Sequence, residues 1–374
     1  TNKSKIIKYV LSCKKKDFNF SNTTNADQNS FALNFAILIF YLIGEDKFLK
    51  ENKDILINNL INNLDLENFE TGNINKFNLQ LLTITLSSLK VLNFQDFHIF
   101  KSNKFIKDLI ENKIKVNEFL NSYDCLNGKP SSGNMAMFLG IILIFINNDL
   151  KIDKTDEINC WIELHLKKLN QNSFWGRHQN MTYSQLQNGY HQYEVFNFLD
   201  KENNLIKNIS IQNILKLSDQ IGQFSPVFGG DACHDYDAIY LLTLFKDKKK
   251  LIKPNLIQLR ESLLKCFNND GGFCENIYVN NKIKNFRSML LHAFVYGEYS
   301  RKEKIIKYFS LFRYKNFFIQ TQFDSNKRKW SDSSLFTTWF RLLSIAKIEV
   351  YLNLETNNKW QFINFPGIGY DKKI

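Results

Sequence analysis

Seven residues near the middle of the chain, 231–237, bring three carboxyl groups, a thiol and an imidazole close together. They run directly into the apolar segment 238–245, so we expect them to form the first turn of a buried helix. A charged group in such a place is costly unless it is paired, binds a metal or takes part in a reaction. The segment is therefore the first candidate for an active site, with Asp231, Cys233, Asp235 and Asp237 as its candidate residues.

A second group of reactive side chains lies in the segment Tyr190-His-Gln-Tyr-Glu194. His191 and Glu194 are three positions apart and share one face of a helix, so they could act as a base with its orienting carboxylate or as two metal ligands. A buried histidine that hydrogen-bonds a neighbouring hydroxyl is the structural alternative. Trp175 and Arg177 lie in the loop before this helix, where Arg177 could bind an anion.

A unit of about fifty residues recurs along the chain, and it indicates which elements position these groups. Each unit contains an amphipathic helix, a turn with an aromatic residue beside Gly, Asn or Asp, and a markedly apolar helix. The apolar helices are centred near residues 36, 84, 139, 191, 240, 292 and 340. Helical hairpins whose second helix is apolar on nearly all sides close into a double ring. We therefore expect an all-α protein, an α/α toroid of six or seven helical hairpins in a single domain, 1–374. An open superhelical array is the alternative.

In a closed toroid, the first turns of the inner helices meet at one end of a central cavity. Many polar residues in these turns are also of the types that cap helices, and capping is their structural alternative. The candidate segments are 25–29, 131–134, 185–191, 231–237, 284–292 and 331–334.

The turns 171–176 and 269–275 resemble the QW-type repeats of terpenoid cyclases and the equivalent repeats of protein prenyltransferase β subunits. The segment 330–346 is similar to a final repeat of that superfamily. The resemblance implies an α/α toroid enzyme that acts on an isoprenoid or similarly apolar substrate in its central cavity.

Class II terpene cyclases open an inner helix with Asp-x-Asp-Asp, which Asp235-Tyr-Asp-Ala238 matches except at its last position. This similarity implies that Asp237 is the general acid that protonates the substrate. His234 or Asp235 would hold its proton through hydrogen bonds. Aromatic residues would bind the substrate and stabilise a cation, and the candidates are Trp175, Tyr190, Tyr236, Phe273 and Trp339.

Protein prenyltransferase β subunits bind zinc through an Asp-x-Cys pair and a later histidine. Asp231 and Cys233 match the pair, and His292 lies in the next expected inner helix, about one turn later than in the family. The similarity implies zinc-dependent transfer, in which the metal lowers the pKa of an acceptor thiol. Arg287 and Arg177, together with Lys284 and Arg341, would then bind a phosphorylated substrate. The Asp-rich motif of class I terpene synthases, which binds magnesium, is missing.

Two other classes of protein stay open. Toroids of this kind also carry sugar lyases, hydrolases and epimerases, for which Tyr190, His191, Asp235 and Asp237 would transfer protons. A cavity lined by polar groups would favour that class, and one walled by Phe, Leu and Ile would favour a terpenoid. A non-catalytic binding protein is the third class, with the carboxylates fully paired.

The composition excludes several further roles. The net charge of +12 comes from lysines spread along the 374 residues, which indicates a solvated surface, and no nucleic-acid partner is expected. The longest apolar segments, 31–44 and 135–146, are shorter than the roughly 20 residues that span a bilayer. We expect them to be buried helices, although peripheral contact with a membrane stays open. Six scattered cysteines without a CxxC pair, and no visible signal peptide, favour a cytoplasmic protein.

Overall fold

The computed structural model describes residues 3–64, 74–129, 131–176, 181–206, 209–277, 305, 307–309, 318–354 and 360–372. These residues are mainly helical, and the all-α prediction is confirmed. Their only named strands, β1 (Phe318–Ile319) and β2 (Arg328–Lys329), form a short antiparallel pair in which Ile319 lies opposite Arg328.

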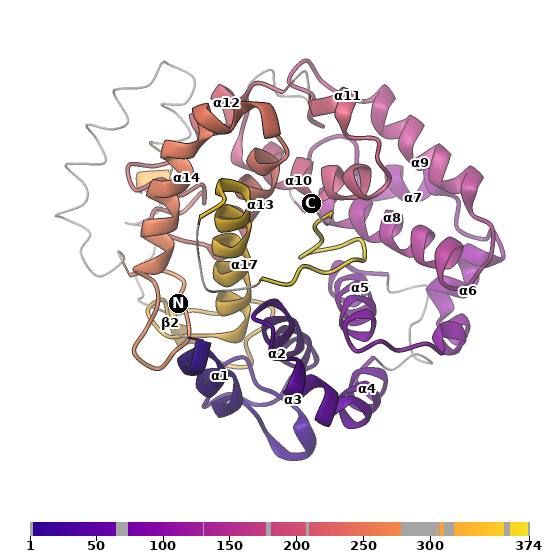
Figure 1. Cartoon of the computed structure of the whole chain (residues 1–374). Helices are drawn as coiled ribbons and strands as arrows, with labels where there is room; N and C mark the ends of the chain where they lie inside the picture. Colours follow the sequence, from indigo (N-terminus) through magenta and orange to yellow (C-terminus); the bar gives the residue numbers. More distant parts are fainter. Residues whose placement is uncertain are drawn as a thin grey trace.

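Six helices surround a common centre (Figure 1). Each packs against the next in chain order, and the last packs back against the first, so that the circuit of contacts closes. These helices lie at the places expected for the apolar helix of each repeat, and the one expected near residue 292 falls outside the described residues. The complete double ring of six or seven hairpins stays a prediction, as does the single domain. The six helices are α2 (Ser30–Leu42), α5 (Lys76–Val91), α8 (Ser132–Asn148), α10 (Tyr183–Phe198), α13 (Ala232–Thr243) and α17 (Leu335–Leu352).

The remaining helices are mostly shorter and alternate with these six along the chain. Figure 1 shows most of them on the outside of the circuit. They are α1 (Lys3–Ser12), η1 (Lys16–Phe18), α3 (Asp46–Glu51), α4 (Lys53–Asn62), η3 (Phe97–Ser102), α6 (Lys104–Ile110), α7 (Val116–Ser122), α9 (Thr155–Lys167), α11 (Asn203–Ile206), α12 (Ile211–Leu215), η4 (Lys246–Lys248) and α14 (Lys249–Leu264).

Burial explains the apolar composition of the six central helices. Nearly every side chain of α2 and α8 is buried, as expected for the two longest apolar segments. Helix α10 is different, because Asn188, His191, Gln192 and Glu194 are buried among its apolar residues. Among the described residues, no helix combines the length and apolarity that a bilayer span requires. The polar groups of α10 are buried inside the protein, where each needs a partner or a function.

Capping residues fix where most of the central helices begin. The side chains of Asn29, Asn75, Thr182, Asp231 and Ser334 each accept a hydrogen bond from a backbone N–H in the first turn of the following helix. Such a bond satisfies one of the free N–H groups at a helix N-terminus. These caps therefore determine which side chains occupy the first turns.

The C-terminal segment, 360–372, crosses the middle of the circuit (Figure 1). Gly369 has a φ of 103° and lies so close to Trp339 that a Cβ atom there would be 2.9 Å from the indole ring. Asp371 anchors the segment through an ion pair with Lys347 on α17, with Nζ and Oδ2 3.0 Å apart. Because the segment fills the centre, the cavity lined by Trp339 and Gly367 measures only about 20 Å³.

Candidate active site

A cavity of about 530 Å³ lies at the N-terminal end of the central helices. Its walls come from α5, α8, α10, α13 and α17, from the β1–β2 hairpin, and from Ile368 of the C-terminal segment. Candidate residues from three of the predicted segments thus lie at one cavity. The polar part of the lining comprises Lys76, Gln80, Asn134, Gln187, His191, Asp231, Cys233, Asp237, Glu275, Gln320, Thr321 and Gln322, and the apolar part includes Phe318, Phe323, Phe336 and Phe340.

Asp237 is a buried carboxyl group at the wall of this cavity. Its side chain is 2% exposed, and its Oδ2 atom has no hydrogen-bond partner in the described part of the chain. Burial raises the pKa of Asp237 well above its ordinary value; His234 opposes this rise, and the carboxyl groups of Asp231, Glu194 and Asp235 add to it. Burial therefore favours the protonated form of Asp237, which can give its proton to a molecule in the cavity.

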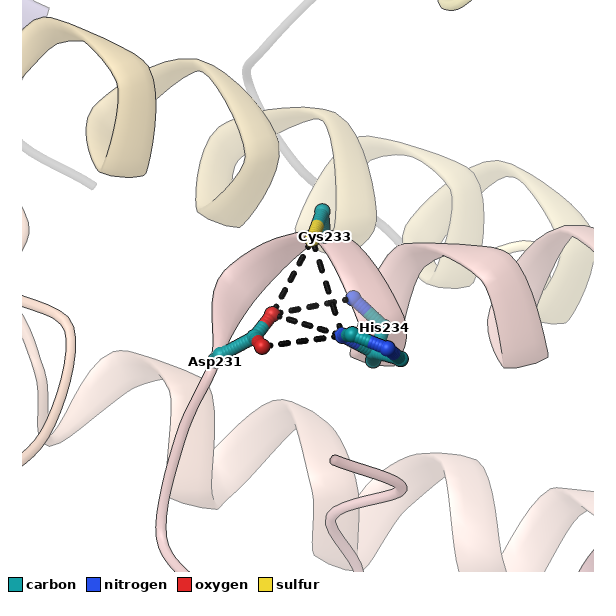
Figure 2. A group of neighbouring side chains, drawn as sticks. All are labelled: Asp231, Cys233 and His234. Carbon is teal, nitrogen blue, oxygen red and sulfur yellow. Dashed lines mark hydrogen bonds and ion pairs between the residues drawn. The ribbon is translucent and has the colours of Figure 1, made fainter. Parts of the chain in front are cut away.

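Three side chains at the start of α13 form a compact cluster (Figure 2). The Asp231 carboxylate accepts from Cys233 Sγ at 3.0 Å and from His234 Nδ1 at 2.9 Å, and Sγ lies 3.7 Å from Nδ1. Burial opposes the charge on His234, but Asp231 outweighs it and raises the pKa of His234 to about 9. In turn, His234 lowers the pKa of Asp231 despite its burial. Burial and Asp231 raise the pKa of Cys233, so the cluster holds a neutral thiol beside an ion pair.

The same cluster fits the donor set of a zinc site. Ligand atoms bound tetrahedrally at zinc distances of about 2.0 to 2.3 Å lie about 3.3 to 3.7 Å apart. The separation of 3.7 Å between Cys233 and His234 falls in this range, and the distances of 2.9 and 3.0 Å from Asp231 are about 0.3 to 0.4 Å shorter, so a small outward shift of Asp231 would bring the donors to three corners of a tetrahedron. Asp231 and Cys233 both line the cavity, from which a fourth ligand would come. The third donor is thus His234, whereas His292 lies outside the described residues.

His191 lines the cavity and carries a buried ring nitrogen that has no partner among the described residues. Asn134 Nδ2 donates to His191 Nε2 at 2.8 Å, so the proton of the neutral ring is on Nδ1, which has no partner among the residues that the structure describes. Burial lowers the pKa of His191 well below its ordinary value, and the charges of Lys76 and His234 lower it further. At neutral pH His191 is therefore uncharged and can orient an oxygen atom of a ligand.

A set of buried groups lies on α10 and α13 beside this lining. The rings of Tyr190 and Tyr236 are fully buried and meet edge to face, with centroids 5.5 Å apart. Burial raises the pKa of Glu194 to about 8, against the opposing effects of the Tyr190 hydroxyl and of Lys347. Neither Tyr190 nor Tyr236 is among the cavity-lining residues. Both support the wall as packed, fully buried aromatic residues.

Asp235, in contrast to Asp237, is a paired carboxyl group. Its carboxylate is fully buried, forms an ion pair with Arg341 at 2.5 Å, and accepts from the backbone N–H of Phe224 at 2.7 Å. These contacts fill its hydrogen-bonding positions and hold α13 against α17. These contacts give Asp235 a structural role away from the cavity lining, and its expected part in proton transfer stays a prediction.

The two tryptophans expected to bind substrate also lie elsewhere. Trp175 is fully buried, donates from Nε1 to the carbonyl of His165 at 2.9 Å, and stacks against Phe196. Trp339 lines the small central cavity rather than the larger one. The remaining candidates, Arg177 and Arg287, lie outside the described residues, as does Lys284.

Several residues of the lining were not recognised from the sequence as parts of the site. Lys76 and Gln80 come from the first turns of α5, the apolar helix expected near residue 84. The Asn75 cap before Lys76 was the available signal. Glu275, expected to be a turn residue, accepts from the backbone N–H of Ala232 at 3.0 Å and from the hydroxyl of Thr337, so it fixes the starts of α13 and α17.

Comparisons of the chain with protein-family models, with curated proteins and with solved structures found no match. What the arrangement can do is therefore judged from its own chemistry. A protonated acid, Asp237, an uncharged imidazole, His191, and a potential metal cluster at Asp231 lie at one cavity.

Proposed function

We propose that this chain is an enzyme that binds a hydroxylated, sugar-like substrate in the cavity and uses Asp237 as a general acid. The observation that carries this proposal is the buried Asp237 carboxyl, which lines the cavity and has no hydrogen-bond partner on Oδ2 among the described residues. A structural carboxyl in this position would be paired, as Asp235 is with Arg341.

The proposed proton transfer uses groups that already lie at the start of α13. Asp237 donates its proton to an oxygen atom of the substrate, and its carboxylate becomes charged. The nearby His234 imidazolium favours that charged form, because it lowers the pKa of Asp237. The Nδ1–H group of His191 can donate a hydrogen bond to a second oxygen atom of the substrate.

The lining favours a hydroxylated substrate over the isoprenoid that the family resemblance implies. The amides of Gln80, Asn134 and Gln187 occupy one side of the cavity, with Phe336 and Phe340 also in the wall. Asn134 Oδ1 has no partner among the described residues, and a substrate hydroxyl could donate to it, whereas an isoprenoid chain could not. The cavity of about 20 Å³ beside Trp339 also leaves no room for a long apolar chain in the centre.

A screen for solvent exchange tests the general acid across several substrate classes at once. The protein is incubated in heavy water and in ¹⁸O-labelled water with neutral sugars, sugar acids, sugar phosphates and an isoprenoid diphosphate, and products are measured by mass spectrometry. We expect conversion of a sugar derivative and a loss of about 100-fold or more in Asp237→Asn. The matched control, Asp247→Asn, changes an exposed carboxylate on η4 and should retain full activity. Conversion of the isoprenoid alone, or full activity in Asp237→Asn, would contradict the proposal.

Zinc-dependent transfer is a second candidate, favoured by the near-tetrahedral spacing of Asp231, Cys233 and His234. Zinc held there would lower the pKa of a thiol or water molecule at its open position. These three residues would bind the metal after Cys233 loses its proton and His234 becomes neutral. Asp237 would then lie beside a cation that favours its ionised form.

Metal analysis separates the two candidates. The protein is purified with zinc present, dialysed, and analysed for bound metal by mass spectrometry. Zinc-dependent transfer predicts one zinc per chain, lost in Cys233→Ser and in His234→Gln. Cys160→Ser is the matched control, because this thiol lies on α9 outside the cavity lining. Stoichiometric zinc with this dependence would replace the metal-free acid mechanism, and absence of binding at micromolar zinc would exclude the second candidate.

A further inference from the structure

We infer that the substrate of this cavity carries an anionic group, a carboxylate or a phosphate, which is bound by Lys76 and His191. The inference rests on the proposed function, since it takes the cavity to be the substrate site. It adds the chemical class of the substrate and two residues that select it.

Lys76 provides the cationic part of this subsite. It is the first residue of α5, directly after the Asn75 cap, and its side chain lines the cavity. It has no ion-pair or hydrogen-bond partner among the described residues, unlike Lys154, which pairs with Glu157 at 2.8 Å. Partial burial lowers the pKa of Lys76, whereas the nearby Cys233 and Asp237 raise it. A partly desolvated ammonium group without a partner favours an anion from solution.

The other ionisable groups of the lining do not neutralise Lys76. Asp231 is paired with His234 at 2.9 Å, and burial favours the protonated, uncharged form of Asp237. The Glu275 carboxylate forms an ion pair with Arg328, with Oε2 and Nη2 3.7 Å apart, and accepts from Ala232 and Thr337. Each of these groups thus has its own partner or is uncharged, whereas the Lys76 ammonium has none among the described residues, and a neutral substrate would leave it unpaired.

His191 supplies a second donor to the same ligand. It is 5% exposed, and its Nδ1–H group, which has no partner in the described part of the chain, belongs to a side chain that lines the cavity. Lys76 and His191 line the same cavity although they come from α5 and α10, and the charge of Lys76 lowers the pKa of His191. A carboxylate or phosphate offers several acceptor oxygens and can take both hydrogen bonds at once. A neutral hydroxyl would accept from one of these two donors and would leave the positive charge of Lys76 without a counter-charge.

The anion and the reacting oxygen belong to one small molecule, because Lys76 and Asp237 line one cavity of about 530 Å³. Sugar acids and sugar phosphates both meet this requirement. Both are a hydroxylated ring or chain with a terminal anionic oxygen group. Direct binding measurements distinguish the sugar acids from the sugar phosphates.

Isothermal titration calorimetry at low ionic strength tests the subsite with three probes, D-glucuronate, glucose 6-phosphate and glucose. We expect at least one acid to bind about tenfold more tightly than glucose, and Lys76→Gln to remove this advantage. His191→Gln should reduce the affinity for the acid by a smaller factor. Lys47→Gln, at an exposed position on α3, is the matched control and should bind as the unmodified chain does. Lys76 is partly exposed at the start of its helix, so Lys76→Gln should fold, and its circular dichroism spectrum and urea midpoint verify this.

The possible results separate this inference from the general-acid proposal. Equal affinity for glucose and both acids, no saturable binding of either acid, or an unchanged advantage in folded Lys76→Gln would overturn the inference. Asp237→Asn should keep the advantage for the acid while it loses turnover. Full turnover in Asp237→Asn, together with loss of the advantage in Lys76→Gln, would leave the anion subsite in place and remove only the role of Asp237.

Discussion

The Asp235 carboxylate and the Arg341 guanidinium form a fully buried ion pair between α13 and α17, with Oδ2 and Nη1 2.5 Å apart. Arg341 also donates to the backbone carbonyl of Glu275 at 2.9 Å, and Glu275 lines the cavity. Two residues along α13, Asp237 has no such partner on Oδ2 among the described residues. One turn of helix thus contains a carboxylate that holds the fold together and a carboxyl that is free to react.

We expect Arg341→Met to lower the free energy of unfolding by about 3 to 5 kcal/mol, because it leaves the buried charge of Asp235 without a partner. Asp235→Leu should have a similar effect through Arg341. The double variant should lose much less than the sum of the two, since it leaves neither charge unpaired. Urea unfolding followed by circular dichroism measures all three proteins. A single variant as stable as the unmodified chain would show that the pair contributes nothing.

Glu194 should make the protein less stable as the pH rises. Its pKa in the folded protein is about 8, above the roughly 4.3 of an exposed glutamate, so the folded chain keeps a proton that the unfolded chain has lost between these values. The free energy of unfolding therefore falls across this window, by at most about 1.4 kcal/mol per pH unit.

Glu194→Gln should remove this part of the pH dependence. Between about pH 5 and about pH 8, we expect the unmodified chain to lose at least about 2 kcal/mol more than the variant in urea unfolding. Glu261→Gln, at an exposed position on α14, is the control and should follow the unmodified chain. If the free energies of unfolding of Glu194→Gln and of the unmodified chain changed in parallel with pH, Glu194 would be ionised in the folded protein.

The ion pair at the start of α13 gives a spectroscopic prediction. In protein freed of metal by a chelator, the ring of His234 should titrate with a pKa of about 9, because Asp231 stabilises its charged form. Asp231→Asn should lower this pKa by at least about one unit. Nuclear magnetic resonance of ¹³C-labelled histidine measures both values, and Asp247→Asn serves as the control. An unshifted His234 in the unmodified chain would contradict the assigned charge state.

The sequence predicted the parts of the fold that leave a periodic pattern. The apolar helices α2 and α8 were expected at their observed places because their apolar residues extend over several turns. The cluster of Asp231 and Cys233 was recognised because charge next to an apolar helix is unusual in any fold.

Pairing over long distances in the chain could not be predicted in this way. Asp235 and Arg341 are 106 positions apart, and only the packing of α13 on α17 shows which carboxyl group is paired. Lys76 is one of 49 lysines and arginines, and nothing in its neighbours distinguishes it from a surface lysine. The C-terminal segment, 360–372, lacks regular structure over most of its length, so no periodicity indicated that it fills the centre.

The close contact between α8 and α10 gives a final prediction about how the site is positioned. A Cβ atom at Gly133 would lie 2.5 Å from the backbone of Asn188, and the backbone N–H of Gly133 donates to Asn188 Oδ1 at 3.0 Å. Gly133→Ala must therefore push the helices apart, and we expect it to cost about 2 to 3 kcal/mol despite the better helix propensity of alanine. Asn134 and His191 lie beside this contact, so their hydrogen bond should weaken as well.

Gly140→Ala is the matched control, because it lies on the same helix but its Cβ atom would meet only side chains, the closest being Val195 at 3.0 Å. A small rotation of Val195 can relieve that contact, so the variant should stay within about 1 kcal/mol of the unmodified chain. Urea unfolding compares the two variants, and ¹⁵N-histidine spectra report on the His191 ring. If Gly133→Ala proved as stable as Gly140→Ala and left the His191 signals in place, then the approach of α8 to α10 would not position the Asn134–His191 pair.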